Sequence, residues 1–157
     1  MPAAKPKNIY QRINEVRKKI GYVKKDAKVQ SYVAVTHDAV TAVVREHLIA
    51  QGVIVIPTLL RSELKDSGST TSNGRTIWLY RGYYDVAFVN EDDPDDRIVM
   101  QVEAHAEDHG DKASGKSISY AVKYALLKLL SLETGVNEES RIEATQRTIA
   151  PEPVSYT

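Results

Sequence analysis

The sequence predicts a single α+β domain in which helices pack on one face of a three-stranded antiparallel sheet, with the elements in the order α-α-β-β-β-α. Three observations support this fold class. Apolar residues recur at helical spacing up to residue 51, β-branched and alternating patterns occupy residues 53–107, and helical spacing returns over residues 114–132. The chain has 157 residues, a length that suits one domain, which we expect to span 1–135 with an acidic tail over 136–157.

Two helices are expected first. Residues 7–20 place four apolar side chains at spacings of four, three and four, and Gly21 suits the end of a helix. These side chains are Ile9, Ile13, Val16 and Ile20. The second helix is expected over residues 36–51, because Thr36 is a favourable N-cap and Gly52 ends the helical pattern.

Three strands of an antiparallel meander are expected next. The first covers residues 53–60, where Pro57 indicates an edge or a bulge. A loop over residues 67–74 ends in Asn-Gly, which is typical of a hairpin, and leads into a strand over residues 75–90. The third strand, over residues 97–107, alternates apolar and polar side chains. One face of the second strand is expected to enter the core and carries Trp78, Tyr80, Tyr84, Val86 and Phe88.

The last helix, expected over residues 114–132, has two faces of different character. Its apolar stripe consists of Ile118, Val122, Ala125, Leu126 and Leu129. The opposite face carries a row formed by Lys112, Lys116, Ser119 and Lys123. Ammonium groups about 6 Å apart along a helix match the spacing of phosphates along an extended strand. Ser117 and the amides near Ser114 would add neutral hydrogen-bond donors. The pattern therefore indicates contact with a nucleic-acid backbone. The alternative is that the lysine face is merely solvated.

Charge and composition narrow the function classes. The 21 basic and 21 acidic side chains cancel in total but are separated along the chain. Residues 1–28 hold nine basic side chains against two carboxylates, residues 91–96 hold five carboxylates, and residues 133–157 hold five Glu against two Arg. Such a separation suits encounter with a polyanion. The absence of Cys excludes a disulfide framework, a cysteine zinc site and a cysteine nucleophile.

No membrane partner is expected from the sequence. No apolar run approaches the ~20 residues that span a bilayer. The N-terminus lacks the apolar segment of a signal peptide, so we expect a cytoplasmic protein.

The last helix also carries a family resemblance. Residues 111–132, DKASGKSISYAVKYALLKLLSL, resemble the signature of the Erf-type single-strand annealing proteins of bacteriophages. In that family an Asp-Lys step, a second Lys and a [Thr/Ser]-Tyr-Ala-x-Lys-Tyr-Ala-Leu core recur together. A looser match over residues 7–132 includes the basic first helix, the second helix, and Tyr83, Tyr84 and Asp85 on a long hairpin.

The resemblance implies a β-β-β-α annealing core, similar to the eukaryotic Rad-type annealing mediators, that assembles into homo-oligomeric rings or helical filaments. It implies ATP-independent binding of single-stranded DNA and annealing of complementary strands in phage homologous recombination, in the cytoplasm of a bacterial host. The implied DNA-binding residues are Lys112, Lys116, Lys123, Tyr120, Tyr124 and Lys128. Eukaryotic relatives tend to have a basic residue where Tyr124 stands, which indicates more stacking here. Host single-strand binding protein is a further implied partner, through a C-terminal region that relatives carry beyond the core.

Secondary DNA contacts are expected from the sequence itself. They are Arg75, Arg81 and Tyr80 on the hairpin, and Lys24 and Lys25 after the first helix. No turnover chemistry, no ATP and no other cofactor are expected, and a bound magnesium ion is left open.

Three alternatives remain. Residues 110–117, GDKASGKS, satisfy the Walker A pattern, but they follow a polar strand rather than the buried parallel strand of a P-loop. A metal-dependent nuclease would use Asp85, Glu103 and His105, with carboxylates on adjacent strands. A protein-interaction domain would not bind DNA at low salt.

Overall fold

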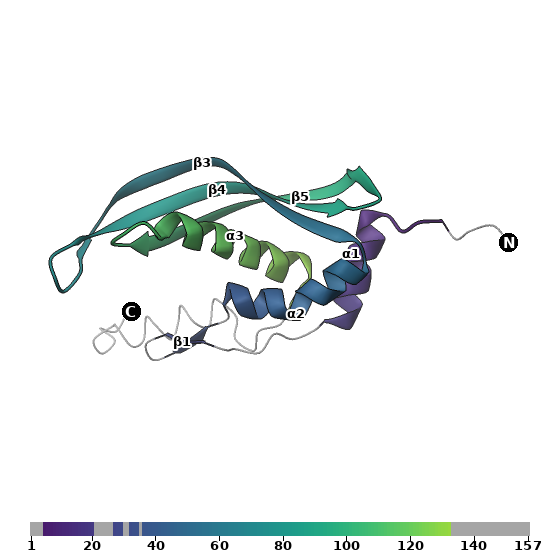
Figure 1. Cartoon of the computed structure of the whole chain (residues 1–157), viewed down its shortest axis with the longest axis horizontal. Helices are drawn as coiled ribbons and strands as arrows, with labels where there is room; N and C mark the ends of the chain where they lie inside the picture. Colours follow the sequence, from purple (N-terminus) through teal and green to yellow (C-terminus); the bar gives the residue numbers. More distant parts are fainter. Residues whose placement is uncertain (1–4, 21–26, 30–31, 35, 133–157) are drawn as a thin grey trace, which may run out of the picture.

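The computed structural model describes residues 5–20, 27–29, 32–34 and 36–132 (Figure 1). In chain order the elements are α1 (Ile9–Lys19), β1 (Ala27–Val29), β2 (Tyr32–Ala34), α2 (His37–Ala50), β3 (Val53–Thr70), β4 (Thr76–Asn90), β5 (Asp93–Asp108) and α3 (Ala113–Leu129). Strands β3, β4 and β5 form one antiparallel sheet in that order. Figure 1 shows a long, curved sheet with the helices on one side, α3 running along it and α1 and α2 near one end.

The predicted fold class is confirmed. The three main helices and the three-stranded sheet follow one another in the expected order, and α3 packs on β4 and β5. The small antiparallel hairpin of β1 and β2 was not predicted. The predicted acidic tail and the Gly21 helix end lie outside the described residues. Among the described residues, no helix is long and apolar enough to cross a membrane.

The first strand of the sheet is longer than predicted. Strand β3 continues to Thr70 and pairs with β4, with register shifts between Leu59 and Arg61 and between Asp66 and Thr70. Its second half carries no apolar alternation. It is held by the backbone ladder to β4 and by the Arg61 guanidinium, which lies 3.7 Å from the ring centre of Tyr83. The predicted Asn-Gly turn is confirmed: Gly74 has φ +79°, and its amide donates to Thr71 O at 2.9 Å.

The turn between β4 and β5 is shorter than the acidic turn predicted over residues 91–96. Only Glu91 and Asp92 connect the strands, and Asp93 already pairs with Asn90. Most of the carboxylates of residues 91–96 therefore belong to β5 rather than to a loop.

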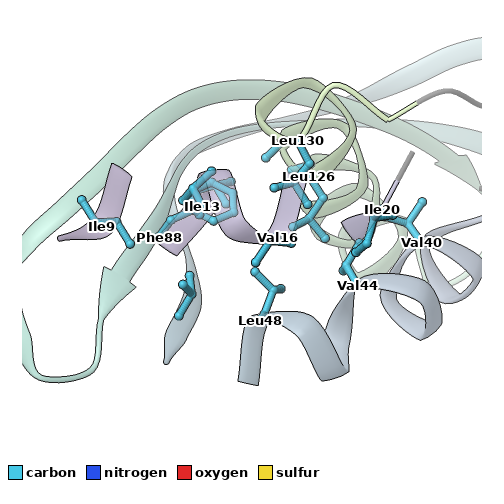
Figure 2. Close-up of a cluster of buried hydrophobic side chains, with 14 of the residues drawn as sticks. Ile9, Ile13, Val16, Ile20, Val40, Val44, Leu48, Phe88, Leu126 and Leu130 are labelled. Atoms are coloured by element: carbon cyan, nitrogen blue, oxygen red, sulfur yellow. The ribbon is translucent and has the colours of Figure 1, made fainter. Parts of the chain in front are cut away.

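The core lies between the sheet and the helices (Figure 2). The predicted stripe of α1 is buried, and it meets one face of α2 and the inner face of β4. The principal buried side chains are Ile9, Ile13, Val16, Ile20, Val40, Val44, Leu48, Tyr84, Val86, Phe88, Leu126 and Leu130. Burial of each large apolar side chain contributes about 1.5–3 kcal/mol to stability. Of the predicted aromatic face, Trp78 remains 40% exposed, because it lies towards the end of the sheet that the core does not reach.

The rotation of α3 on the sheet agrees in part with the prediction, since Ala125 and Leu126 are buried as expected. Its fully buried line has small side chains every fourth residue, and Ile118, Val122 and Leu129 are only partly buried. This line consists of Ala113, Ser117, Ala121 and Ala125. Small side chains allow the helix to lie close to the strands, so packing on the sheet decides which face is buried.

A polar network fixes the N-terminus of α1 to the end of the sheet. The buried Arg12 side chain donates to Lys7 O at 2.7 Å and Gln51 O at 3.0 Å, and it pairs with Asp92 at 2.8 Å. Asp96 Oδ2 accepts from the Ile9 amide at 2.8 Å. These contacts hold α1 in place, which in turn supports α2 and α3.

Candidate nucleic-acid interface

An open cleft of about 600 Å³ lies where the first turns of α2 and α3 meet. From α3 and the loop before it, the lining residues include Lys112, Lys116, Ser119 and Tyr120. From α2 they include Thr36, His37 and Asp38. The N-terminal ends of two helices and two lysines therefore meet at one cleft, an arrangement that favours anions.

The first turn of α2 is fixed by side-chain hydrogen bonds. Thr36 is the N-cap, as predicted, and its Oγ1 accepts from the Ala39 amide at 3.1 Å. His37 lies 3.3 Å from Thr41 Oγ1 and 3.4 Å from Asp38 Oδ1. The cleft wall formed by α2 is thus held in a defined conformation.

The start of α3 is organised by a carboxylate from the preceding strand. Lys112 is the N-cap residue but supplies no side-chain cap. Asp108 Oδ2 instead accepts from the amides of Gly110 at 2.9 Å and Lys112 at 3.1 Å. Asp108 Oδ1 accepts from Lys116 Nζ at 3.1 Å, and Lys116 also donates to Glu107 O at 3.3 Å.

These contacts stabilise the charged form of Asp108. The hydrogen bond from Lys116 and those from the two loop amides lower the pKa of this carboxyl to about 2. Asp108 is the last residue of β5, next to a polar loop, and its side chain is only 11% exposed. The loop before α3 therefore already holds one anion, supplied by the chain itself.

Lys123 lies further along α3, beyond the residues that line the cleft. Its ammonium is 5.2 Å from the ring centre of Tyr120 and 4.7 Å from that of Tyr124. Tyr124 is 38% exposed and Lys128 is also exposed. This cluster combines a cation with accessible ring surface, which suits a phosphate beside a stacked base.

Ser117 does not face the cleft, in contrast to the expected phosphate donor. It is fully buried, donates to Ala104 O at 2.8 Å and lies 2.8 Å from Tyr84 Oη. Burial raises the pKa of the Tyr84 hydroxyl, so this phenol stays neutral. The pair fastens α3 to β4 and β5.

The hairpin residues do not join the cleft. Arg81 lies on the face of β4 opposite α3, where it forms an ion pair with Glu103 at 3.0 Å. Arg75 is exposed beside the β3–β4 turn, and Tyr80 is partly buried on the inner face. Lys24 and Lys25 lie outside the described residues. The structure thus brings together the α3 residues and separates them from Arg81.

The residues of the nuclease alternative are also on the outer face. Asp85 pairs with Gln101, and Glu103 is engaged by Arg81. Within the described ranges, no three His, Asp or Glu side chains are grouped so that they could hold a metal ion. The geometry gives this alternative no support.

The Walker-like segment 110–117 differs from a P-loop in its surroundings. It follows β5, which is an edge strand of an antiparallel sheet. The amides of Gly110 and Lys112 already donate to Asp108. A P-loop instead follows a buried parallel strand and presents its amides to a nucleotide.

Two parts of the site were missed from the sequence. Asp108 has a recognisable signal, because an Asp two residues before a Gly commonly accepts from the backbone of the following turn. The contribution of Thr36, His37 and Asp38 has no local signal, since only the packing of α2 on α3 brings it to the cleft.

The sequence matches a known protein family. A family model described as the ERF superfamily matches residues 9–153. No curated protein matches the sequence.

Proposed function

Because the chain belongs to the ERF superfamily, whose general role is single-strand annealing in phage recombination, we propose that it binds single-stranded DNA and anneals complementary strands without ATP. The observation that carries this proposal is the row on α3. Lys112, Lys116 and Ser119 line an open cleft, and Lys123 continues the row between two tyrosines.

The chemistry of this row fits the sugar-phosphate backbone. Ammonium groups replace the counterions of the phosphates, so binding weakens as salt is added. The first turns of α2 and α3 add partial positive charge at the cleft. Contacts of this kind carry no base specificity, so one site accepts any sequence.

Annealing requires the bases to remain available. A strand held through its phosphates presents its base edges for pairing, and Tyr120 and Tyr124 offer ring surface on which a base can stack. Pairing itself releases free energy, because stacking in a duplex is worth about 1.4 kcal/mol per step. The proposed reaction therefore needs no nucleotide hydrolysis.

We also propose that the working form is a homo-oligomer, a ring or a helical filament. Within the described chain, β3 and β5 are edge strands that offer unpaired backbone groups, which favours pairing with another copy. Strand β3 also exposes Ile54, Ile56, Leu59, Leu60 and Leu64. Assembly would join one short lysine row to the next and hold a long strand by many weak contacts.

A salt titration of DNA binding tests the site. The variant Lys116→Ala/Lys123→Ala removes two cations from the row, whereas Lys65→Ala/Arg97→Ala removes two from the outer face of the sheet. With a labelled oligonucleotide, we expect at least tenfold weaker binding for the first variant. Its plot of log K against log salt should be flatter by at least about 0.7, at ~0.7 per phosphate contact. Equal loss in both variants would show that general charge, rather than this row, binds DNA.

A further inference from the structure

The loop before α3 holds a bound anion that belongs to the protein itself. The Asp108 carboxylate takes three donors: the amides of Gly110 and Lys112, and the ammonium of Lys116. We infer that these donors form a phosphate subsite of the DNA-binding cleft, and that Asp108 fills it until a phosphate of the bound strand displaces it. This inference rests on the proposed function and adds a regulatory residue to it.

Charge and geometry make the exchange feasible. A phosphodiester carries one negative charge and presents two free oxygens, as a carboxylate does. Backbone amides of a turn form a concave site that holds phosphates in other proteins, and here the Gly110 and Lys112 amides are joined by the Lys116 ammonium. Replacement of one monoanion by another leaves the net charge of the subsite unchanged.

The subsite is continuous with the cleft. Lys112 and Lys116 are both cleft-lining residues, and Lys116 is 41% exposed although it is paired with Asp108. An incoming phosphate can therefore approach the Lys116 ammonium from the open side. Asp108 is the last residue of β5, so its side chain can turn away without a change in the strand.

This exchange makes Asp108 an internal competitor. While the pair is intact, the Lys116 charge is neutralised within the protein and does not add to the attraction for DNA. Displacement has to break this ion pair, which lowers the affinity for any single strand. A moderate affinity benefits annealing, because strands must be released once they have paired.

The test compares Asp108→Asn with a matched control. Asp111→Asn removes the same charge from another residue that lines the cleft but has no part in the Asp108 contacts. We expect Asp108→Asn to bind a labelled oligonucleotide about three- to tenfold more tightly than wild type at low salt, with a dependence on salt that is steeper by about 0.7. Asp111→Asn lowers the negative charge of the cleft without releasing Lys116, so it should tighten binding by a smaller factor than Asp108→Asn and keep the salt dependence of wild type.

A double-mutant cycle shows whether the effect passes through Lys116. In a Lys116→Ala background, Asp108→Asn should no longer tighten binding, because no masked ammonium remains to be released. Weaker or unchanged binding by Asp108→Asn, or an equal gain in Asp111→Asn, would overturn the inference. If wild type binds no single-stranded DNA, the proposed function itself fails; if it binds and only the Asp108 effect is missing, the function stands.

A measurement on wild type covers the case in which Asp108→Asn does not fold. The amide signals of Gly110 and Lys112 in an NMR spectrum report on the Asp108 hydrogen bonds. Addition of a short oligonucleotide should shift both signals if a phosphate replaces the carboxylate. Unchanged amide signals at saturating DNA would show that Asp108 stays in place.

Discussion

At the scale of single residues, Asp108 links stability to pH. Its pKa is lowered from 3.8 to about 2 in the folded protein. A depressed carboxyl pKa stabilises the fold above the unfolded value, and this contribution is lost as the pH falls from about 4 towards 2. We expect Asp108→Asn to be less stable than wild type at pH 6 in urea unfolding, and the difference should narrow at pH 2.5. If the difference in the free energy of unfolding stayed constant between pH 6 and pH 2.5, the ion pair of Asp108 with Lys116 would not contribute to stability.

Ser117 provides a second test at the residue scale, because the structure assigns it to packing rather than to DNA. Ser117→Ala leaves the buried Tyr84 hydroxyl and the Ala104 carbonyl without this partner, at a cost of about 1–3 kcal/mol in the free energy of unfolding. Tyr84→Phe removes the hydroxyl but keeps the Ser117 bond to Ala104, so it should cost less. Loss of DNA binding by Ser117→Ala at unchanged stability would show that Ser117 is a DNA ligand after all.

At the scale of elements, the Asp96 carboxylate is one of the groups that attach α1 to the sheet. Asp96 accepts from the Ile9 amide at 2.8 Å and from Asn90 Nδ2 at 3.0 Å. Asp96→Ala should therefore lower the free energy of unfolding by about 1–3 kcal/mol, measured by urea denaturation. The neighbouring Asp95→Ala, which removes an exposed carboxylate, is the control and should change stability by less than about 0.5 kcal/mol. Equal losses of stability in the two variants would mean that the removal of a negative charge, rather than the loss of the Asp96 hydrogen bonds, changes the free energy of unfolding.

The elements also show what local sequence determines. The stripe of α1, the Thr36 cap and the Asn-Gly turn were predicted, because each follows from contacts within a few residues. The second half of β3 was not, since residues 61–70 are held by pairing with β4 and carry no apolar period. The buried face of α3 was predicted in part. Ala125 and Leu126 are buried as expected, but close packing on the sheet favours small Ala and Ser side chains over the other predicted apolar residues.

At the scale of the whole molecule, some features of the site follow from local sequence and others depend on tertiary packing. The row of Lys112, Lys116, Ser119 and Lys123 was predicted, because helical spacing defines it. The meeting of α2 with α3, and the separation of Arg81 from this row, depend on tertiary packing and on strand alternation. The ion pair between Lys116 and Asp108 could not be predicted, because it depends on the conformation of the loop between β5 and α3.

The exposed apolar side chains of β3 give the prediction for assembly. Leu60→Ser/Leu64→Ser should produce smaller species than wild type in sedimentation velocity experiments, because contacts between copies are weakened. Tyr10→Ser/Ile49→Ser removes exposed apolar side chains from α1 and α2 and should leave the assembly unchanged. Identical sedimentation of wild type and the β3 variant would place the interface elsewhere.

Annealing of two complementary labelled oligonucleotides, followed by energy transfer in the absence of any nucleotide, tests the central claim most directly. Wild type should accelerate pairing well above the spontaneous rate, Lys65→Ala/Arg97→Ala should retain that acceleration, and Lys116→Ala/Lys123→Ala should lose most of it. No acceleration by wild type, or an unchanged rate for Lys116→Ala/Lys123→Ala, would contradict the proposal that this row on α3 anneals DNA.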